Sequence, residues 1–131
     1  MFHTATKILF FSAVILISTS TASANQPIYG TSSFYTVESC KREGTSGVFT
    51  ASGERFDENA LTCAIGSYKF GKKFRVTNLE NGKSVIVRHN DFGPNKKLRR
   101  KGRIIDLSKG AFRRIADLKH GLIKVKVEVV K

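Results

Sequence analysis

The residues best suited to proton chemistry stand together at the end of one β-branched run, in SVIVRHNDFGP at positions 84–94. His89 and Asp91 can each hold and transfer a proton. They share one parity with Val85 and Val87, so in a strand all of these side chains point to one face. An ionised carboxylate is costly in a core. Asp91 is therefore expected where that face emerges into a cleft or a loop.

A structural role competes with proton transfer for these two residues. Gly93-Pro94 breaks the chain just after Asp91, and an aspartate at such a point often caps the turn by accepting backbone N–H bonds. His89 can equally be a packed residue at the rim. The local sequence favours the turn role for Asp91 and leaves both alternatives open.

Alternating segments predict the strands that must position this site. Residues 74–77 and 84–88 alternate between apolar and polar side chains on either side of Asn81-Gly82, which is a strong hairpin signal. Residues 123–129 alternate apolar residues with lysine and glutamate. This pattern is typical of a strand with one buried face.

One further segment has a helical pattern. Ser108 is a suitable N-cap, and apolar residues recur after it at helical spacing up to Gly121. Residues 29–37 suit another strand, and the polar residues 38–47 are expected to form a loop. Several short strands and one short helix (about 108–119) predict a mainly β fold, namely a small closed barrel. An open α+β sheet is the alternative that periodicity leaves open.

The N-terminus has the pattern of a secretory signal peptide over residues 1–24. A cationic start precedes the apolar run ILFFSAVILIST and an Ala-x-Ala sequence ending at Ala24. The run is shorter than the roughly 20 residues that span a membrane, and no cysteine near Ala24 could carry a lipid. We therefore expect a periplasmic or secreted protein without a membrane anchor, with residues 25–131 as one domain.

The chain is strongly basic, with a formal net charge of +13. Only Lys7 of its charged residues lies in the predicted signal peptide. A basic surface favours polyanions such as nucleic acid, anionic lipid or an acidic cell wall, and export makes nucleic acid the least expected of these. A basic surface can also be merely solvated, so the charge alone leaves a binding role open.

Two cysteines, Cys40 and Cys63, follow the predicted signal peptide. In an oxidising compartment an even count favours one disulfide, and two free thiols are the alternative. Two cysteines without a nearby histidine pair cannot complete a tetrahedral metal site. We therefore predict a Cys40–Cys63 disulfide, and neither a metal nor another cofactor.

Three blocks of the sequence resemble one known family. The blocks TASGERFDENALTCA (50–64), FGKKFRVTNLENGKSVIVRHNDFGP (70–94) and GRIIDLSKGAFRRIA (102–116) are similar to the rare-lipoprotein-A (RlpA-like) family. That family includes septal lytic transglycosylases, and the likeness covers roughly residues 31–130. It implies a six-stranded double-psi β-barrel with a groove that holds glycan. Expansins and one cellulase family have more remotely similar barrels.

The resemblance places acidic residues at three positions of the family pattern. Glu54 matches the acid of Gly-Glu-x-Phe, Asp91 that of Asn-Asp-x-Gly-Pro, and Asp106 that of Ile-Asp-Leu-Ser. These three are the expected catalytic residues. Where the family's transglycosylases have a histidine after Ala-Leu-Thr-Ala-Ala, this chain has Ile65. Four further residues are expected to contact the substrate: His89, Tyr35, Thr50 and Asn90.

The chemistry implied by the resemblance needs few groups. Cleavage of a glycosidic bond requires an acid for the leaving oxygen and stabilisation of an oxocarbenium-like centre. In a lytic transglycosylase the sugar's own 6-hydroxyl attacks, so one carboxyl group can act first as acid and then as base. Asp91 or Asp106 fits this role. Glu54 could orient the sugar, and His89 could replace the missing histidine.

The resemblance and the predicted signal peptide together imply an exported lytic transglycosylase that acts on peptidoglycan. We expect it to be a monomer, and because of export we expect no nucleic acid as partner. The alternative is a non-catalytic, expansin-like module that binds or loosens the cell wall. Ile65 and the high positive charge support this alternative.

Overall fold

The computed structural model describes residues 14–15, 26–42 and 49–131 of the chain. The predicted signal peptide therefore lies outside the described residues, apart from positions 14 and 15. In the described ranges, no helix has the length and apolar character needed to cross a membrane.

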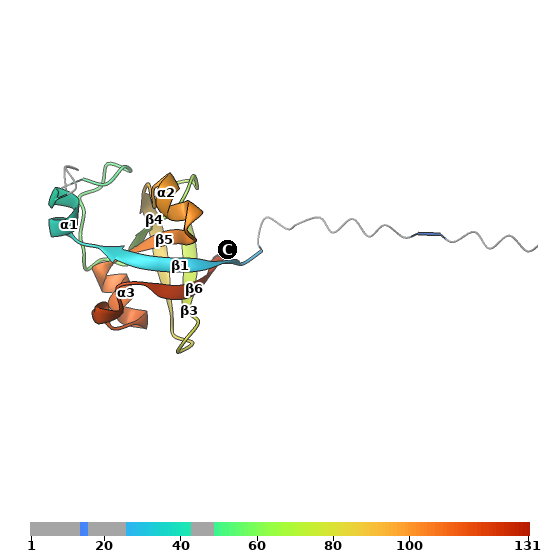
Figure 1. Ribbon diagram of the computed structural model, residues 1–131. Helices are drawn as coiled ribbons and strands as arrows, with labels where there is room; N and C mark the ends of the chain where they lie inside the picture. Colours follow the sequence, from blue (N-terminus) through green and yellow to red (C-terminus); the bar gives the residue numbers. More distant parts are fainter. Residues whose placement is uncertain (1–13, 16–25, 43–48) are drawn as a thin grey trace, which may run out of the picture.

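Six strands close into one barrel, shown in Figure 1. They are β1 (Ile28–Tyr35), β2 (Thr62–Ala64), β3 (Lys73–Asn78), β4 (Ser84–Asp91), β5 (Arg103–Ser108) and β6 (Ile123–Val129). Their order around the barrel is β1-β5-β2-β4-β3-β6. The β1–β5 and β2–β4 neighbours run parallel, and the other neighbours run antiparallel. The predicted mainly β, six-stranded barrel is confirmed.

The segments with clear alternation form the regular part of the barrel. Strands β3 and β4 pair antiparallel, with Phe74 opposite Val87 and Val76 opposite Val85. The loop between them contains Gly82, whose φ of 73° lies in the left-handed region that glycine adopts without strain. One face of these strands fills the core. The largest side chains of this core are Phe74, Phe112, Ile105, Leu107 and Ile115.

The predicted helix begins where expected and ends early. Helix α3 (Lys109–Ile115) follows Ser108, whose side-chain oxygen accepts the N–H of Ala111 at 3.2 Å. The predicted N-cap is confirmed. A separate 3-10 turn, η1 (Leu118–His120), follows the end of α3. Helix α3 packs against β1, β4 and β5.

Two further short helices occur where the sequence predicted none. Helix α1 (Val37–Arg42) occupies the start of the segment expected to be a loop. Thr36 and Ser39 cap it reciprocally, since each side-chain oxygen accepts the other residue's N–H, at 3.0 and 2.8 Å. Helix α2 (Lys96–Arg100) is capped by Asn95 and lies against β5. In Figure 1, α2 and α3 lie on opposite sides of the barrel.

Cys63 is a free cysteine in the described part of the chain, so the predicted disulfide is not formed there. Its side chain is fully buried in the core, where Cys63 is paired with Leu107 of β5. Burial raises the pKa of the Cys63 thiol, which keeps it protonated and unreactive. The side chain of Cys40 lies outside the described residues.

Candidate functional site

A bulge near the end of β4 decides which way Asp91 faces. In the ladder between β2 and β4, Cys63 lies opposite His89, but the next residue, Ala64, lies opposite Asp91. Asn90 is thus an extra residue in β4, as in a β-bulge. A shift of one residue moves a side chain to the other face of a sheet. The expectation that Asp91 shares the inward face of His89 is therefore wrong.

Two aspartates flank Ala64 in one row across three strands. Ala64 is paired with Asp91 of β4 on one side and with Asp106 of β5 on the other. Paired residues share a face, and neighbouring strands are about 4.8 Å apart, so the two aspartate Cα atoms are roughly 10 Å apart. The next row, which includes Leu107, points into the core. The aspartate row therefore lies on the outer face of the barrel.

Asp91 is anchored through one carboxylate oxygen. Its Oδ1 accepts the N–H of Phe92 at 2.9 Å and the N–H of Ala51, 40 positions earlier in the chain, at 3.0 Å. Within the described residues, Oδ2 has no hydrogen-bond partner. The first oxygen thus fixes the carboxylate, as the turn role predicted, and the second is open to a ligand.

Asp106 is held by a cation of its own strand and lies under the turn that follows Asp91. Its Oδ1 accepts the Nε–H of Arg103 at 2.6 Å, and its side chain is 14% exposed. A Cβ built on Gly93 would lie 3.5 Å from the Cβ of Ala64 and 4.0 Å from Oδ2 of Asp106. The turn after Asp91 therefore folds back over β2 toward Asp106.

Glu54 forms a two-pronged ion pair with Arg88 of β4. The distances are 2.5 Å from Oε1 to Nη1 and 2.8 Å from Oε2 to Nη2. The hydrogen bonds from Arg88 lower the pKa of the Glu54 carboxyl, so it stays ionised near neutral pH. The Glu54 carbonyl also accepts the N–H of Thr50 at 2.8 Å. These contacts close the turn that brings Ala51 to Asp91, and they suit Glu54 to positioning better than to proton donation.

Two of the residues expected to contact substrate shape the covering loop (residues 49–60), and their contact with substrate stays a prediction. Thr50 is buried, and its hydroxyl lies 2.8 Å from that of Ser52. Asn90 is also buried, and its backbone carbonyl accepts the N–H of Ser52 at 3.2 Å. Thr50 therefore stabilises the covering loop from within, and Asn90 ties that loop to the bulge of β4.

Tyr35 lies on the same face of the barrel as the aspartates. It is paired with Ser108 of β5. Asp106 lies two residues before Ser108 in the same strand, so the side chains of Tyr35 and Asp106 point to the same face. Its ring packs on Phe56 of the covering loop at 5.0 Å between centroids. Burial raises the pKa of the Tyr35 hydroxyl, and the charges of Asp91 and Asp106 raise it further. The hydroxyl is therefore neutral and can donate a hydrogen bond.

His89 is fully buried beneath the site, as the packed-residue alternative predicted. Its Nε2 lies 3.0 Å from the carbonyl oxygen of Tyr68, which can only accept, so this nitrogen carries the proton. Burial lowers the pKa of His89. Its ring packs against Phe70, and Phe70 packs against Phe92, each at 5.0 Å between centroids. His89 therefore supports an aromatic stack that reaches the surface.

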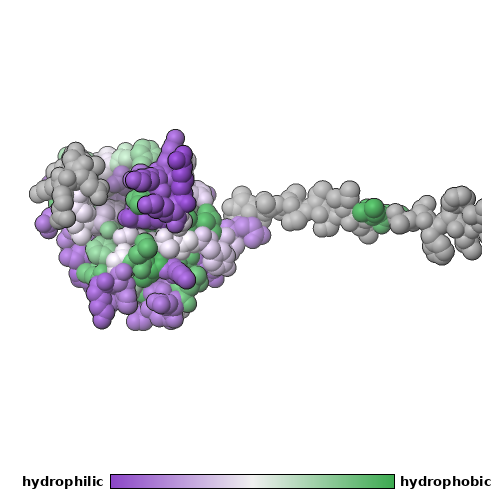
Figure 2. Space-filling view, in the orientation of Figure 1, coloured by the Kyte–Doolittle hydropathy of each residue, from purple (hydrophilic) through white to green (hydrophobic). Residues whose placement is uncertain are grey.

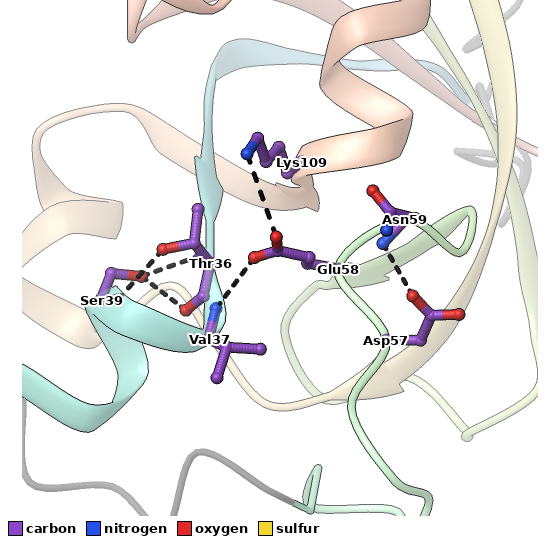
Figure 3. A network of polar contacts seen from close by, with 7 residues as sticks. All are labelled: Thr36, Val37, Ser39, Asp57, Glu58, Asn59 and Lys109. Carbon is purple, nitrogen blue, oxygen red and sulfur yellow. Dashed lines mark hydrogen bonds and ion pairs between the residues drawn. The ribbon is translucent and has the colours of Figure 1, made fainter.

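The far end of the covering loop is tied to two helices (Figure 3). Glu58 accepts the N–H of Val37 at 3.2 Å, and its other oxygen lies 3.9 Å from Nζ of Lys109. The Glu58 carbonyl accepts the N–H of Gly110 at 2.8 Å. A Cβ on Gly110 would lie 2.4 Å from the carbonyl oxygen of Asn59, so only glycine fits there. The loop that holds Asp91 is thereby fixed at both ends.

A hollow of about 450 Å³ opens beside the turn after Asp91, and we call it the Phe92 hollow. Phe92 is 65% exposed at its edge. Figure 2 shows a strongly hydrophilic patch over the adjoining helix α2. Ile65, at the position of the family histidine, is buried just before the wall of the hollow. The lining residues are Gly66, Ser67, Phe92, Gly93, Pro94, Asn95, Lys96 and Arg99.

Sequence reasoning missed several parts of this site. The alternation predicted only that Arg88 is a polar residue of a strand. A cation at this position could also have suggested an ion pair with Glu54. Phe92 occupied the variable position of a family block, and the strand that separates the two aspartates is only three residues long. No cluster of three or more metal-binding side chains occurs in the described ranges.

Residues 22–127 match a family described as lytic transglycolase. The "Probable endolytic peptidoglycan transglycosylase RlpA" of Nostoc sp. is 45% identical over 101 residues, which are 77% of this chain and 25% of that protein. The protein of the same name from Synechocystis sp. is 48% identical over 88 residues, 67% of this chain and 26% of the relative. The chain thus spans about a quarter of the length of these relatives.

Two solved structures share the barrel. A Streptomyces papain inhibitor has a TM-score of 0.61 at 22% identity and covers 81% of this chain and 96% of its own. An expansin of Clavibacter michiganensis has a TM-score of 0.59 at 21% identity, over 81% of this chain and 51% of its own. At such identities the likeness shows the fold alone.

Proposed function

Because the chain belongs to the lytic transglycolase family, we propose that it cleaves the glycan strands of peptidoglycan and leaves 1,6-anhydro-muramyl ends. The row Asp91–Ala64–Asp106 is the observation that carries this proposal. It presents two carboxylates on the outer face, and one of them has an open oxygen. The related proteins named as endolytic peptidoglycan transglycosylases support the same chemistry.

Asp91 acts first as acid and then as base. Its Oδ2 gives a proton to the glycosidic oxygen as the bond to C1 of the muramyl residue breaks. The same oxygen then takes the proton of that residue's 6-hydroxyl, whose oxygen attacks C1 and closes the anhydro ring. Asp106 lies across Ala64 and supplies negative charge that stabilises the oxocarbenium-like centre.

The remaining residues hold this arrangement. Glu54 and Arg88 fix the turn that delivers the Ala51 N–H to Asp91. Tyr35, whose neutral hydroxyl is buried, packs on Phe56 and holds the covering loop against the face that carries the aspartates. His89 acts through the aromatic stack rather than by contact with the reacting atoms.

A non-catalytic module that binds or loosens the wall is the second candidate function. The specific observation in its favour is the buried Ile65 at the position where the family's transglycosylases have a histidine. This candidate predicts binding to the wall without new strand ends.

We also propose an extracytoplasmic location, because peptidoglycan lies outside the cytoplasm. Residues 1–24 would be removed as a signal peptide, and residues 25–131 would act as a monomer without a membrane anchor. The N-terminal sequence supports this proposal. Edman sequencing of the exported protein tests it, and a mature chain that keeps its first 24 residues would contradict it.

Incubation of residues 25–131 with purified sacculi, followed by mass spectrometry of the released fragments, tests the proposed activity. New anhydro-muramyl ends that increase with time are expected. Sedimentation of the protein with sacculi without new ends would contradict catalysis and favour the binding module.

A further inference from the structure

We propose that the Phe92 hollow is a subsite for a muramyl residue, in which Phe92 packs on the sugar ring while Lys96 and Arg99 bind a carboxylate attached to it. The proposal rests on the proposed function, because the occupant is part of a peptidoglycan strand that crosses the aspartate row. It adds a second recognition element outside the reacting centre.

The hollow adjoins the aspartate row. Gly93 belongs to its lining and also lies over Ala64, close to Oδ2 of Asp106. A strand with one glycosidic bond at the aspartates would therefore place a neighbouring sugar in the hollow. The turn from Asp91 to Pro94 forms the border between the two places.

Phe92 has the properties of a rigid apolar platform. Its ring is largely exposed, although a phenyl group gains free energy from burial. Phe70 supports it from below and is itself packed on the buried ring of His89. A side chain already held in place loses little conformational freedom when a ligand binds. The apolar C–H face of a pyranose ring fits such a platform.

The charges that line the hollow select an anion. Lys96 and Arg99 are both exposed at its wall, and the lining contains no acidic residue. Asn95 is occupied, since its Oδ1 caps helix α2 by accepting the N–H of Leu98. An arginine can bind a carboxylate through two parallel hydrogen bonds, and a lysine adds a compact charge. The hollow therefore fits a carboxylate beside a sugar ring.

A peptidoglycan strand offers carboxylates from two sources. A muramyl residue without a peptide has a free lactyl carboxylate, and a substituted one carries the carboxylates of its stem peptide. Oligomers of N-acetylglucosamine have the same type of backbone and neither carboxylate. Comparison of the neutral oligomer with the two charged strands separates recognition of the sugar from recognition of the charge. Comparison of the peptide-free with the peptide-bearing strand separates the lactyl carboxylate from those of the stem peptide.

The experiment measures dissociation constants for peptide-free strands, peptide-bearing strands and N-acetylglucosamine oligomers, in an Asp91→Asn background that prevents cleavage. Lys96→Gln/Arg99→Gln removes the two cations of the hollow. Lys97→Gln/Arg100→Gln is the matched control, because it removes the same charge from the same helix outside the lining. The first double variant should lose roughly tenfold or more affinity for a carboxylate-bearing strand, and should keep its affinity for the neutral oligomer.

The control should show a smaller loss that disappears at high salt. The loss for peptide-free strands identifies the lactyl carboxylate as the group bound, and a loss confined to peptide-bearing strands identifies the stem peptide. Phe92→Ala should lower the affinity for all three ligands, and Phe92→Tyr should bind all three with the affinity of the parent.

Equal losses in the two double variants, unchanged affinity in the first, or no measurable binding by the parent would each overturn the proposal. Its failure is distinguishable from that of the proposed function. Selective binding by a protein that forms no anhydro ends overturns the activity and keeps the subsite, whereas cleavage without this selectivity overturns the subsite alone.

Discussion

The two halves of strand β4 are built in different ways and serve different ends. From Ser84 to Arg88 the strand alternates regularly against β3, with Val87 buried in the core and Ile86 exposed. From His89 to Asp91 it pairs with β2, and the bulge interrupts the alternation. The regular half builds the core. The irregular half turns a carboxylate outward.

The irregular half also carries the less satisfied polar groups. Within the described residues, Nδ1 of His89 and Oδ1 of Asn90 are buried without a hydrogen-bond partner, and no such atom occurs in the regular half. Unpaired buried polar groups cost free energy of folding. The comparison therefore predicts that substitutions in the two halves separate stability from activity.

The largest expected effect is on stability and comes from the regular half. Phe74→Ala removes a fully buried ring opposite Val87 and should lower the free energy of unfolding by about 3–5 kcal/mol. Ile86→Ala, on the exposed face of the same hairpin, should cost well under 1 kcal/mol. Chemical denaturation measures both, and similar small losses would show that this half does not carry the core.

A smaller loss of stability with a larger loss of activity is expected at Gly93. Its φ of 141° is unfavourable for any other residue, so Gly93→Ala should cost about 1–3 kcal/mol. The new methyl group would also lie in van der Waals contact with Ala64, 4.0 Å from Oδ2 of Asp106, where it would narrow the approach of a glycan to the aspartate row. Gly71→Ala, with a φ of 90° and open space around it, is the matched control for strain. Equal activity of the two variants would contradict the assigned position of the turn.

The buried His89 should make stability depend on pH. Burial lowers its pKa below the usual value of about 6.5, so the unfolded chain binds a proton that the folded chain does not. Stability should therefore fall as the pH drops from about 6.5 toward the lower pKa of the folded state. Melting curves of the parent should show this decline, and those of His89→Phe should not. His120→Gln removes an exposed histidine and should keep it. A decline that persists in His89→Phe must come from another group.

The smallest expected effect is at the pair Glu54–Arg88. Both side chains are partly exposed, so a double-mutant cycle with Glu54→Gln and Arg88→Gln should give a coupling of roughly 0.2–1 kcal/mol. The Glu54 pKa is lowered, so this contribution should be present above about pH 4.3 and lost as the pH falls through the folded pKa. A hundredfold loss of cleavage by Glu54→Gln at unchanged stability would make Glu54 catalytic rather than positioning.

The sequence predicted those parts of the fold that depend on local patterns. Alternation in residues 74–77, 84–88 and 123–129 gave three strands, and the cap at Ser108 gave the start of α3. Helices α1 and α2 were missed because each is shorter than two turns and shows no repeated apolar face. Parity failed for Asp91 because the bulge is defined by pairing with β2, which is distant in the chain.

The candidate site was predicted in part, from the resemblance to a family rather than from local patterns. The family blocks pointed to Asp91 and Asp106 as residues of one site. Both are paired with Ala64 in the barrel, and their joint role stays a prediction. Composition and spacing did not identify Arg88 as the partner of Glu54, or Phe92 as part of a hollow. These contacts arise only when the covering loop and α2 are placed against the barrel.

The central claim is that the bulge of β4 presents Asp91 for proton transfer, and the Asp91→Asn variant tests it most directly. An amide oxygen can still accept the N–H bonds of Ala51 and Phe92. The variant should therefore melt within a few degrees of the parent and lose ~1 kcal/mol or less of its free energy of unfolding. Asp57→Asn is the matched control, because Oδ1 of Asp57 accepts a backbone N–H on the exposed part of the covering loop. With purified sacculi, the Asp91 variant should form anhydro-muramyl ends at least about 100-fold more slowly than the parent, and the Asp57 variant should match the parent. A folded Asp91→Asn protein that cuts at the parental rate would contradict the account.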